Sequence, residues 1–281
     1  MSSLPPPPPP PTCTRHPNRE AGRACTRCGR PFCADCLVQA AVGSHCVECV
    51  RQARPPAAQR VRQWNATRSV VVTKVLLAVN VAVFLYLFVV DAGAAGGRSV
   101  TQGTFDLGLN RVFIANGEWW RLVTSGFIHF GLLHLAFNMY ALWNLGMMME
   151  DAMGRFRFGA LYLAALLAGS AGVLVVGGNG ITGGASGAVF GLFGAAAVGL
   201  HHRGVNPLQT SIGTVLLLNL VLTFAIPGIS IGGHIGGLVG GAICGFAMFA
   251  PPWKRVPLWL VWGTPVVVAV GSVVISFAVS S

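Results

Sequence analysis

Long apolar segments recur along this chain after residue 69, and they constrain its fold more than any other feature. An α-helix needs roughly 20 apolar residues to cross a hydrocarbon core of about 30 Å. Charged residues make up only 10% of the 281 residues, whereas soluble domains contain roughly 25%. The sequence therefore predicts an all-α polytopic membrane protein with seven spans, near residues 70–90, 127–149, 157–176, 186–200, 208–226, 231–250 and 257–279.

The distribution of basic residues predicts the orientation of these spans. The net charge is +11, and ten of the 19 Lys and Arg residues precede residue 69. Others follow the second, fourth and sixth spans: Arg155, Arg157, Arg203, Lys254 and Arg255. Cytoplasmic loops carry an excess of Lys and Arg. We therefore expect a multi-pass protein of the cell membrane with a cytoplasmic N-terminus and an outer C-terminus, and no role in nucleic-acid binding.

Seven of the eight cysteines lie within residues 13–49, where Cys and His form four pairs, each with two residues between its members. This spacing lets both side chains of a pair face one tetrahedral ion, so each pair is half a zinc site. Eight ligands predict two structural Zn²⁺ ions. If the pairs interleave, one site contains Cys13, His16, Cys33 and Cys36, and the other contains Cys25, Cys28, Cys46 and Cys49. His45 is an alternative to Cys46.

A disulfide-bonded knot is the alternative for these cysteines, but a reducing cytoplasm disfavours it. The spacing resembles a B-box-type zinc finger, although Cys46 and Cys49 stand where that family usually has histidines. The resemblance implies a cytoplasmic protein partner and no part in catalysis. A segment this short has too small a core to fold without metal.

These features divide the chain into five parts. The zinc-binding segment (the head, residues 13–50) and a basic linker (residues 51–68) precede the membrane segments. The linker's arginines are expected to lie against anionic headgroups. The parts are a disordered Pro-rich tail (1–12), a two-zinc domain (13–50), a basic linker (51–68), a membrane core (69–250) and an additional transmembrane helix (251–281).

Polar residues interrupt the second apolar segment. His134 and Asn138 are one helical turn apart and share a face. Polar groups in a membrane helix need partners or a wet cavity, so they either hydrogen-bond to another helix or donate to a developing oxyanion. His129 is five residues from His134 and is expected to point elsewhere. Before it, Trp119-Trp120-Arg121 is typical of an interfacial aromatic belt with a snorkelling arginine.

Ser186 and His234 each begin a glycine-rich span, and Gly184 and Gly187 flank the serine. Both spans run in the same direction, and small residues let helices pack closely. The two side chains are therefore expected within hydrogen-bond distance. A serine hydroxyl needs a base to become a nucleophile, and the N–H groups at a helix start suit an oxyanion. No acidic residue follows Asp151, so a Ser–His dyad is favoured over a triad.

Together these residues identify a resemblance. Residues 70–250 resemble the rhomboid intramembrane serine proteases through Trp120-Arg121, His129, His134 and Asn138, Glu150, Gly-Ala-Ser186-Gly, and His234 followed by glycines. The resemblance implies a six-helix rhomboid core, to which the last span adds a seventh C-terminal transmembrane helix. It also implies proteolysis of single-span transmembrane substrates near the outer membrane face, with no cofactor for catalysis.

The resemblance further implies a role for each matched residue. Ser186 would be the nucleophile, and His234 the general base and then the acid. His134, Asn138 and the Ser186 backbone N–H would form the oxyanion hole. Phe190 stands where rhomboids commonly carry a tyrosine that packs on the histidine ring, and it can stack but cannot donate a hydrogen bond. Trp120-Arg121 and Glu150 would be structural.

Other function classes are less consistent with the sequence. A catalytically inactive rhomboid-like membrane chaperone or adaptor is the main alternative, and the presence of both Ser186 and His234 disfavours it. A transporter would require paired ionisable groups or inverted repeats along a pathway. A membrane zinc protease would require a His-Glu-x-x-His motif, which does not occur.

Overall fold

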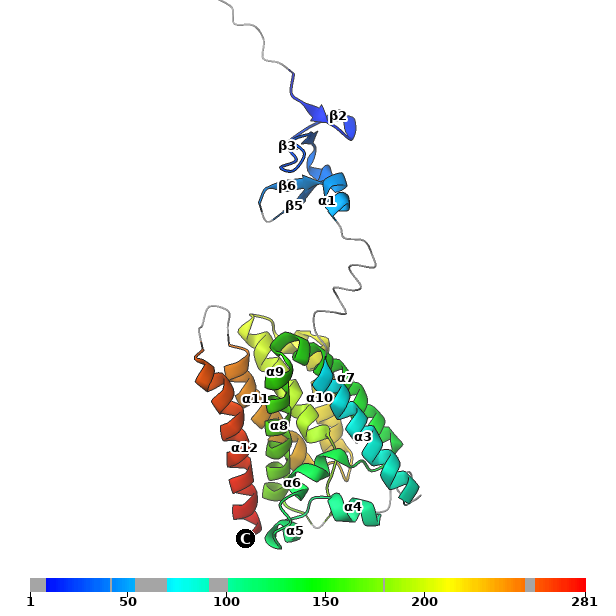
Figure 1. Cartoon of the computed structure of the whole chain (residues 1–281), viewed down its shortest axis with the longest axis vertical. Coiled ribbons are helices and arrows are strands. Elements are labelled where there is room, and N and C mark those ends of the chain that lie inside the picture. Colours follow the sequence, from blue (N-terminus) through cyan, green and yellow to red (C-terminus); the bar gives the residue numbers. More distant parts are fainter. Residues whose placement is uncertain (1–8, 41, 54–69, 91–100, 179, 251–255) are drawn as a thin grey trace, which may run out of the picture. The chain divides into compact units, whose positions relative to one another are not determined.

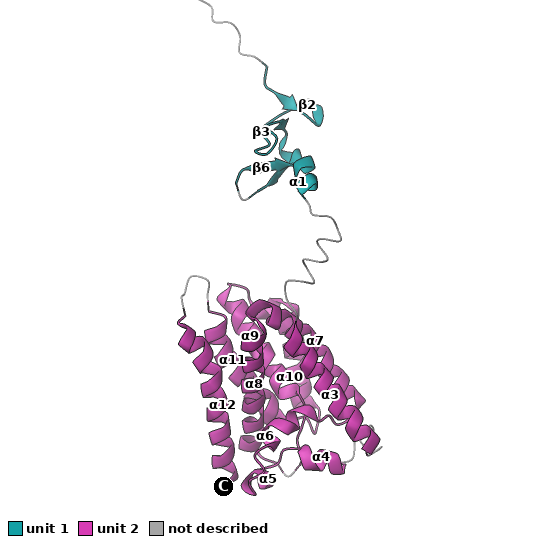
Figure 2. Ribbon diagram, in the orientation of Figure 1, with its two compact units in different colours: residues 1–68 teal, residues 69–281 magenta. Residues whose placement is uncertain are grey.

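The computed structural model describes residues 9–40, 42–53, 70–90, 101–178, 180–250 and 256–281. The chain forms two compact units, residues 1–68 and 69–281, here called unit 1 and unit 2 (Figure 2). Most of the predicted Pro-rich tail and of the predicted basic linker lies outside the described residues. Each unit is considered by itself.

The described part of unit 1 contains three small antiparallel strand pairs, a 3-10 turn and a short helix. The hydrophobic core of its described residues consists of six cysteines and Phe32, which is too little apolar surface to stabilise a domain of this size. The elements are β1 (Thr12–Cys13) paired with β2 (His16–Glu20), β3 (Arg23–Ala24) with β4 (Pro31–Phe32), η1 (Ala34–Cys36), β5 (Leu37–Gln39) paired with β6 (Ser44–Cys46), and α1 (Val47–Ala53).

Unit 2 is a bundle of helices that run alongside one another, with the short α4, α5 and α6 at the end where the chain's C-terminus lies (Figure 1). In chain order it contains α3 (Val71–Val90), α4 (Gln102–Leu107), α5 (Arg111–Ala115), α6 (Arg121–Thr124), η3 (Ser125–Phe127), α7 (Leu132–Met153), α8 (Arg155–Val176), α9 (Ser186–His202), η4 (Pro207–Gln209), α10 (Ser211–Ala225), α11 (Ile231–Met248) and α12 (Leu258–Ser280).

The helices of unit 2 agree with a multi-pass membrane protein. Within the described residues, four helices, α3, α8, α11 and α12, are long and apolar enough to span a bilayer. The bent pair formed by residues 121–127 and α7 makes five if it counts as one span. Each of the seven predicted segments contains a helix, but α9 and α10 have only 17 and 15 residues. The number of seven spans therefore stays a prediction.

The predicted start of the second span, near residue 127, is wrong. The chain bends by 96° between residues 121–127 and α7. Gly131 stands at this bend with a φ of +92°, a conformation that glycine adopts readily. As a result, α7 begins only at Leu132, and His129 lies before the helix.

Glycines bring the backbones of α9 and α11 into direct contact. A Cβ added at Gly237 would overlap the Gly187 carbonyl oxygen, and one at Gly241 would overlap that of Gly191. The helix α8 packs equally closely against α9, since a Cβ added at Gly169 would lie 3.1 Å from the Gly187 Cα. Small residues permit this approach where larger ones would hold helices apart. The starts of α9 and α11 therefore lie side by side.

The substitution Gly237→Ala is expected to destabilise unit 2. The added methyl group would displace α11 from α9, and overpacking of this kind costs about 1–3 kcal/mol. The measurement is thermal unfolding of the detergent-solubilised protein. The matched control is Gly263→Ala in α12, because a Cβ added at Gly263 meets nothing within 4 Å. This variant should be neutral or more stable than wild type, since alanine favours helix. Equal melting temperatures for the two variants would contradict the proposed contact.

Glu150 connects the end of α7 to the beginning of α3. Its side chain is 3% exposed, and its carboxylate accepts hydrogen bonds from the backbone N–H groups of Val72 and Thr73 at 2.9 and 2.7 Å. The first N–H groups of a helix lack intrahelical partners and attract negative charge. The structural role that the family resemblance implies for Glu150 has this physical basis.

Arg121 organises the segment that contains α4, α5 and α6. It is 4% exposed and forms an ion pair with Glu118 at 2.6 Å. Its guanidinium also donates to the carbonyl oxygens of Phe105 and Gly108 at 2.5 and 2.9 Å and lies 3.9 Å above the Phe113 ring. Arg121 is thus a buried structural residue, and the interpretation as a snorkelling arginine is wrong.

Candidate active site and metal centres

The loop that precedes Ser186 is attached to the segment that Arg121 organises. Leu109 and Thr182 exchange two backbone hydrogen bonds of 2.8 and 2.9 Å, and the Gly184 N–H donates to the Ser125 carbonyl oxygen at 2.8 Å. Gly184 has a φ of +134°, which residues with a Cβ rarely adopt. These bonds fix the position at which α9 begins, and with it the position of Ser186.

Ser186 and His234 lie together at the adjoining starts of α9 and α11. The Ser186 Oγ is 2.8 Å from the His234 Nε2, and His234 is 8% exposed. This is the distance of a good hydrogen bond, and it follows from the glycine-mediated packing of the two helices. The arrangement matches that of a nucleophile and its base. The catalytic role of the pair stays a prediction.

The ring of His234 is stacked on Phe190. The ring centroids are 4.0 Å apart and the planes differ by 16°. Phe190 is one turn after Ser186 on α9 and is buried. The stacking fixes the plane of the imidazole ring next to the serine.

A further contact of His234 was not anticipated from the sequence. Thr223 on α10 is 1% exposed, and its Oγ1 lies 2.7 Å from the His234 Nδ1. The cost of a hydroxyl in an apolar helix was a signal that could have identified this residue. The sequence does not indicate, however, which side of α10 faces α11.

His134 borders the space next to Ser186. The Phe130 N–H donates to the His134 Nδ1 at 3.3 Å, so Nδ1 is the acceptor and Nε2 carries the hydrogen. A Cβ added at Gly184 would lie 2.9 Å from this Nε2 and 3.7 Å from the Ser186 Oγ. Because glycine has no Cβ, the Nε2–H and the serine oxygen face a common gap.

Asn138 forms a hydrogen bond within its own helix, and His129 lies beside His134. The Asn138 amide donates to the His134 carbonyl oxygen at 2.9 Å within α7, which leaves its second N–H for another acceptor. His129 is 1% exposed, and its ring packs edge-on against His134 with centroids 5.0 Å apart. The expectation that His129 points elsewhere is wrong, because it assumed one continuous helix through Gly131.

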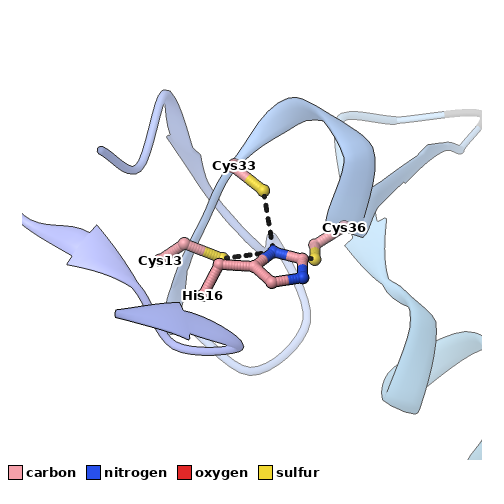
Figure 3. A group of neighbouring side chains, drawn as sticks. All are labelled: Cys13, His16, Cys33 and Cys36. Atoms are coloured by element: carbon pink, nitrogen blue, oxygen red, sulfur yellow. Dashed lines mark hydrogen bonds between the residues drawn. The ribbon is translucent and has the colours of Figure 1, made fainter. Parts of the chain in front are cut away.

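The first predicted metal site of unit 1 is assembled as a tetrad. Cys13, His16, Cys33 and Cys36 offer ligand atoms that all lie within 4.8 Å of one another. The His16 Nδ1 is 3.4 Å from the sulfurs of both Cys33 and Cys36 and 3.9 Å from that of Cys13 (Figure 3). Zn–S bonds of about 2.3 Å and Zn–N bonds of about 2.0 Å place tetrahedral ligands roughly 3.5–3.8 Å apart. The tetrad fits that geometry.

The second tetrad is Cys25, Cys28, Cys46 and Cys49. The sulfurs of Cys28 and Cys46 are 3.9 Å apart, and the Cys46 N–H donates to the Cys25 sulfur at 3.2 Å. An N–H donor of this kind would stabilise a thiolate that binds a metal ion. His45 pairs across the hairpin with Val38 and is not in the tetrad. The four pairs interleave as predicted, and Cys46 rather than His45 belongs to the second tetrad. The binding of zinc by these residues stays a prediction.

The thiols of the second tetrad have different pKa values. Burial works to raise the pKa of Cys25, but N–H donors, led by that of Cys46, outweigh it and lower the pKa to about 6. A hydrogen bond with Cys46, followed by burial, raises the pKa of Cys49 to about 12. Four adjacent thiolates without a cation are therefore unfavourable.

Comparison with known proteins shows what the sequence of this region is similar to. Residues 116–251 match the family model of the rhomboid domain. The chain is 37% identical to rhomboid protease GluP of Bacillus subtilis over 167 residues. This match covers 58% of this chain and 32% of GluP. Over 152 residues it is 36% identical to RHOMBOID-like protein 5 of Arabidopsis thaliana, covering 51% and 48% of the two chains.

A shorter match, 32% identical over 95 residues, covers 34% of this chain and 33% of rhomboid protease AarA of Providencia stuartii. The chain thus spans about a third to a half of the length of these three relatives. The matched region includes Ser186, His234, Asn138 and the ordered segment around Arg121. These residues thus lie in a rhomboid domain, which this chain carries over residues 116–251, and the domain is similar in sequence to those of the rhomboid proteases GluP and AarA.

Proposed function

We propose that this protein is an intramembrane serine protease in which Ser186 and His234 form the catalytic dyad. The observation that carries the proposal is the 2.8 Å contact between the Ser186 Oγ and the His234 Nε2. This contact lies within a bundle of apolar helices in a rhomboid domain. Two relatives, GluP and AarA, are named rhomboid proteases.

The geometry supports acyl transfer through the serine. His234 takes the Ser186 proton at Nε2 while Oγ attacks the scissile carbonyl carbon, and a tetrahedral oxyanion forms. The intermediate collapses when His234 returns that proton to the leaving amine, which breaks the peptide bond. Water, deprotonated by the same nitrogen, then attacks the acyl-enzyme ester. The ester bond breaks as His234 returns this proton to the departing Ser186 Oγ, which restores the dyad and releases the carboxylic acid product.

The oxyanion has three candidate donors. The Ser186 N–H is at the start of α9, where backbone donors lack helical partners. The His134 Nε2–H faces the same gap as the serine oxygen, and Asn138 has an amide hydrogen beyond the one bonded to His134. Preorganised donors in a partly dry site can each contribute about 3 kcal/mol to the transition state.

The proposed orientation has the N-terminus in the cytoplasm, the C-terminus outside, and cleavage of single-span membrane proteins near the outer face. The basic residues before the first span and after the even-numbered spans support this orientation. The loop before Ser186 is hydrogen-bonded to the segment between the first two spans, which is the outer side in this topology.

We also propose a division of the chain into a zinc-binding head, a linker, a rhomboid core and an additional helix. Residues 13–50 hold two structural Zn²⁺ ions and bind a cytoplasmic protein partner, and residues 51–68 link them to the membrane. Residues 69–250 form a six-helix rhomboid core, and residues 251–281 add a seventh transmembrane helix. The two tetrads support the zinc assignment, and the division of the chain near residue 68 agrees with a separate head.

The alternative function is that of an inactive rhomboid-like membrane chaperone or adaptor. Such a protein has no need for a serine hydroxyl and an imidazole at hydrogen-bond distance. Both groups are present here, and the base has a stacking partner and a second hydrogen bond. These contacts favour the protease.

Labelling with a serine-reactive fluorophosphonate tests the proposal. Detergent-solubilised wild-type protein should be labelled, because His234 activates the Ser186 hydroxyl, and Ser186→Ala should not be labelled. The matched control is Ser272→Ala, which removes a buried hydroxyl that donates to the Val268 carbonyl oxygen in α12 and should leave labelling unchanged. Equal labelling of wild type and Ser186→Ala would refute the assignment of the nucleophile.

A further inference from the structure

The Thr223 hydroxyl lies between two partners. Its Oγ1 is 2.7 Å from the His234 Nδ1 and 2.7 Å from the backbone carbonyl oxygen of Asn219, one turn earlier on α10. Thr223 is 1% exposed, so water does not compete for either contact. Both are short enough to be full hydrogen bonds.

The direction of these bonds follows from a count of hydrogens. A threonine hydroxyl has one hydrogen to donate, whereas a carbonyl oxygen can only accept. The contact with Asn219 therefore uses the hydroxyl hydrogen, and Oγ1 must accept from His234. In that arrangement the neutral imidazole carries its hydrogen on Nδ1, and its Nε2 lone pair faces Ser186.

Stacking on Phe190 does not by itself determine the orientation or the tautomer of the His234 ring. A 180° rotation of the His234 ring about its Cβ–Cγ bond preserves the stacked plane, but it exchanges the position of Nδ1 with that of a carbon. The same rotation removes Nε2 from Ser186. An acceptor beside Nδ1 distinguishes the two ring orientations and also selects the tautomer.

We propose that Thr223 is a positioning residue that sets the ring orientation and tautomer of His234, so that the site is a Ser186–His234–Thr223 chain ending on the Asn219 carbonyl oxygen. This inference rests on the proposed protease function. The hydroxyl occupies the place that a carboxylate has in a triad. It accepts from Nδ1–H, and it avoids the cost of a buried anion within the membrane.

Three variants on α10 separate positioning from packing. Thr223→Val keeps the shape and removes the acceptor, so kcat for a single-span substrate should fall about 10- to 100-fold with KM unchanged, the effect of losing one buried hydrogen bond. Thr223→Ser keeps the hydroxyl and should retain most of the wild-type kcat. Thr214→Val is the matched control, because the Thr214 hydroxyl donates to the Thr210 carbonyl oxygen one turn earlier and is exposed.

The tautomer is read directly by ¹⁵N NMR of histidine-labelled protein in detergent, with the His234 signals assigned by their loss in His234→Ala. Wild type should carry hydrogen on Nδ1 and a free Nε2, and Thr223→Val should shift hydrogen toward Nε2, whereas Thr214→Val should not. A wild-type His234 with its hydrogen on Nε2 would overturn the inference, and this result does not depend on how the variants fold.

The kinetic outcomes separate this inference from the proposed function. If Ser186→Ala is inactive while Thr223→Val matches wild type, the protease stands and the positioning role of Thr223 is wrong. Equal losses in Thr223→Ser and Thr223→Val would also overturn it, because the hydroxyl would then not be the relevant group. If Ser186→Ala keeps full activity, the proposed function itself fails.

Discussion

Ser186→Ala and His234→Ala are each expected to reduce cleavage of a single-span model substrate by at least about 10⁴-fold, the loss typical of a serine protease that lacks its nucleophile or base. Without the Ser186 hydroxyl no acyl-enzyme can form. Without the His234 imidazole the hydroxyl stays protonated, because no carboxylate follows Asp151 in the sequence to replace the base. The measurement is the initial rate of cleavage in detergent or vesicles.

The two substitutions should act as one unit. A nucleophile and its base contribute to the same step, so the double variant should lose no more activity than either single variant. Expression and thermal unfolding should stay near wild type, and Ser272→Ala should cleave normally. Turnover close to wild type in either single variant would remove the dyad from the mechanism.

The proximity of Ser186 and His234 could be predicted because it depends on a local feature of the sequence. Glycines at four-residue intervals leave one face of α9 and one face of α11 without side chains, and the two backbones then touch at Gly187 and Gly237. Two helices that run in the same direction bring their first residues to one level. Spacing within a helix is sufficient for this inference.

Predictions that assumed continuous helices failed where the chain bends. His129 packs on His134 because the helix begins after Gly131, and periodicity cannot be extended through a break of this kind. Arg121 is buried because its ion pair and hydrogen-bond acceptors come from residues 105–118. The folding of that loop around a guanidinium depends on tertiary contacts, which hydropathy does not describe.

The role of Thr223 could not be predicted for a related reason. Its contact with His234 joins α10 to α11, and it depends on how α10 is rotated about its own axis. The apolar side chains of α10 are exposed on several sides, so its hydrophobic pattern does not single out an inward face. Only the three-dimensional arrangement brings the hydroxyl to Nδ1.

The grouping of the predicted zinc ligands, in contrast, could be read from the sequence, because it depends on the spacing of Cys and His residues. The second large expected effect is the loss of zinc when one of these residues is replaced. Metal analysis of the purified protein should find two zinc ions per chain, and Cys46→Ser should reduce this number to one. His45→Ala is the matched control and should keep both ions, because the His45 side chain lies outside the tetrads. An unchanged zinc content in Cys46→Ser, or a loss in His45→Ala, would contradict the ligand assignment.

Removal of the metal should unfold unit 1. Its core is six cysteines and Phe32, so its folding free energy must come largely from zinc binding, which supplies about 10–16 kcal/mol in small zinc domains near neutral pH. Chelation should therefore abolish the protease resistance of residues 9–53 under reducing conditions. Fluorophosphonate labelling of Ser186 should persist, since none of the zinc ligands belongs to unit 2. Loss of labelling together with zinc would mean that the head and the membrane domain are energetically coupled.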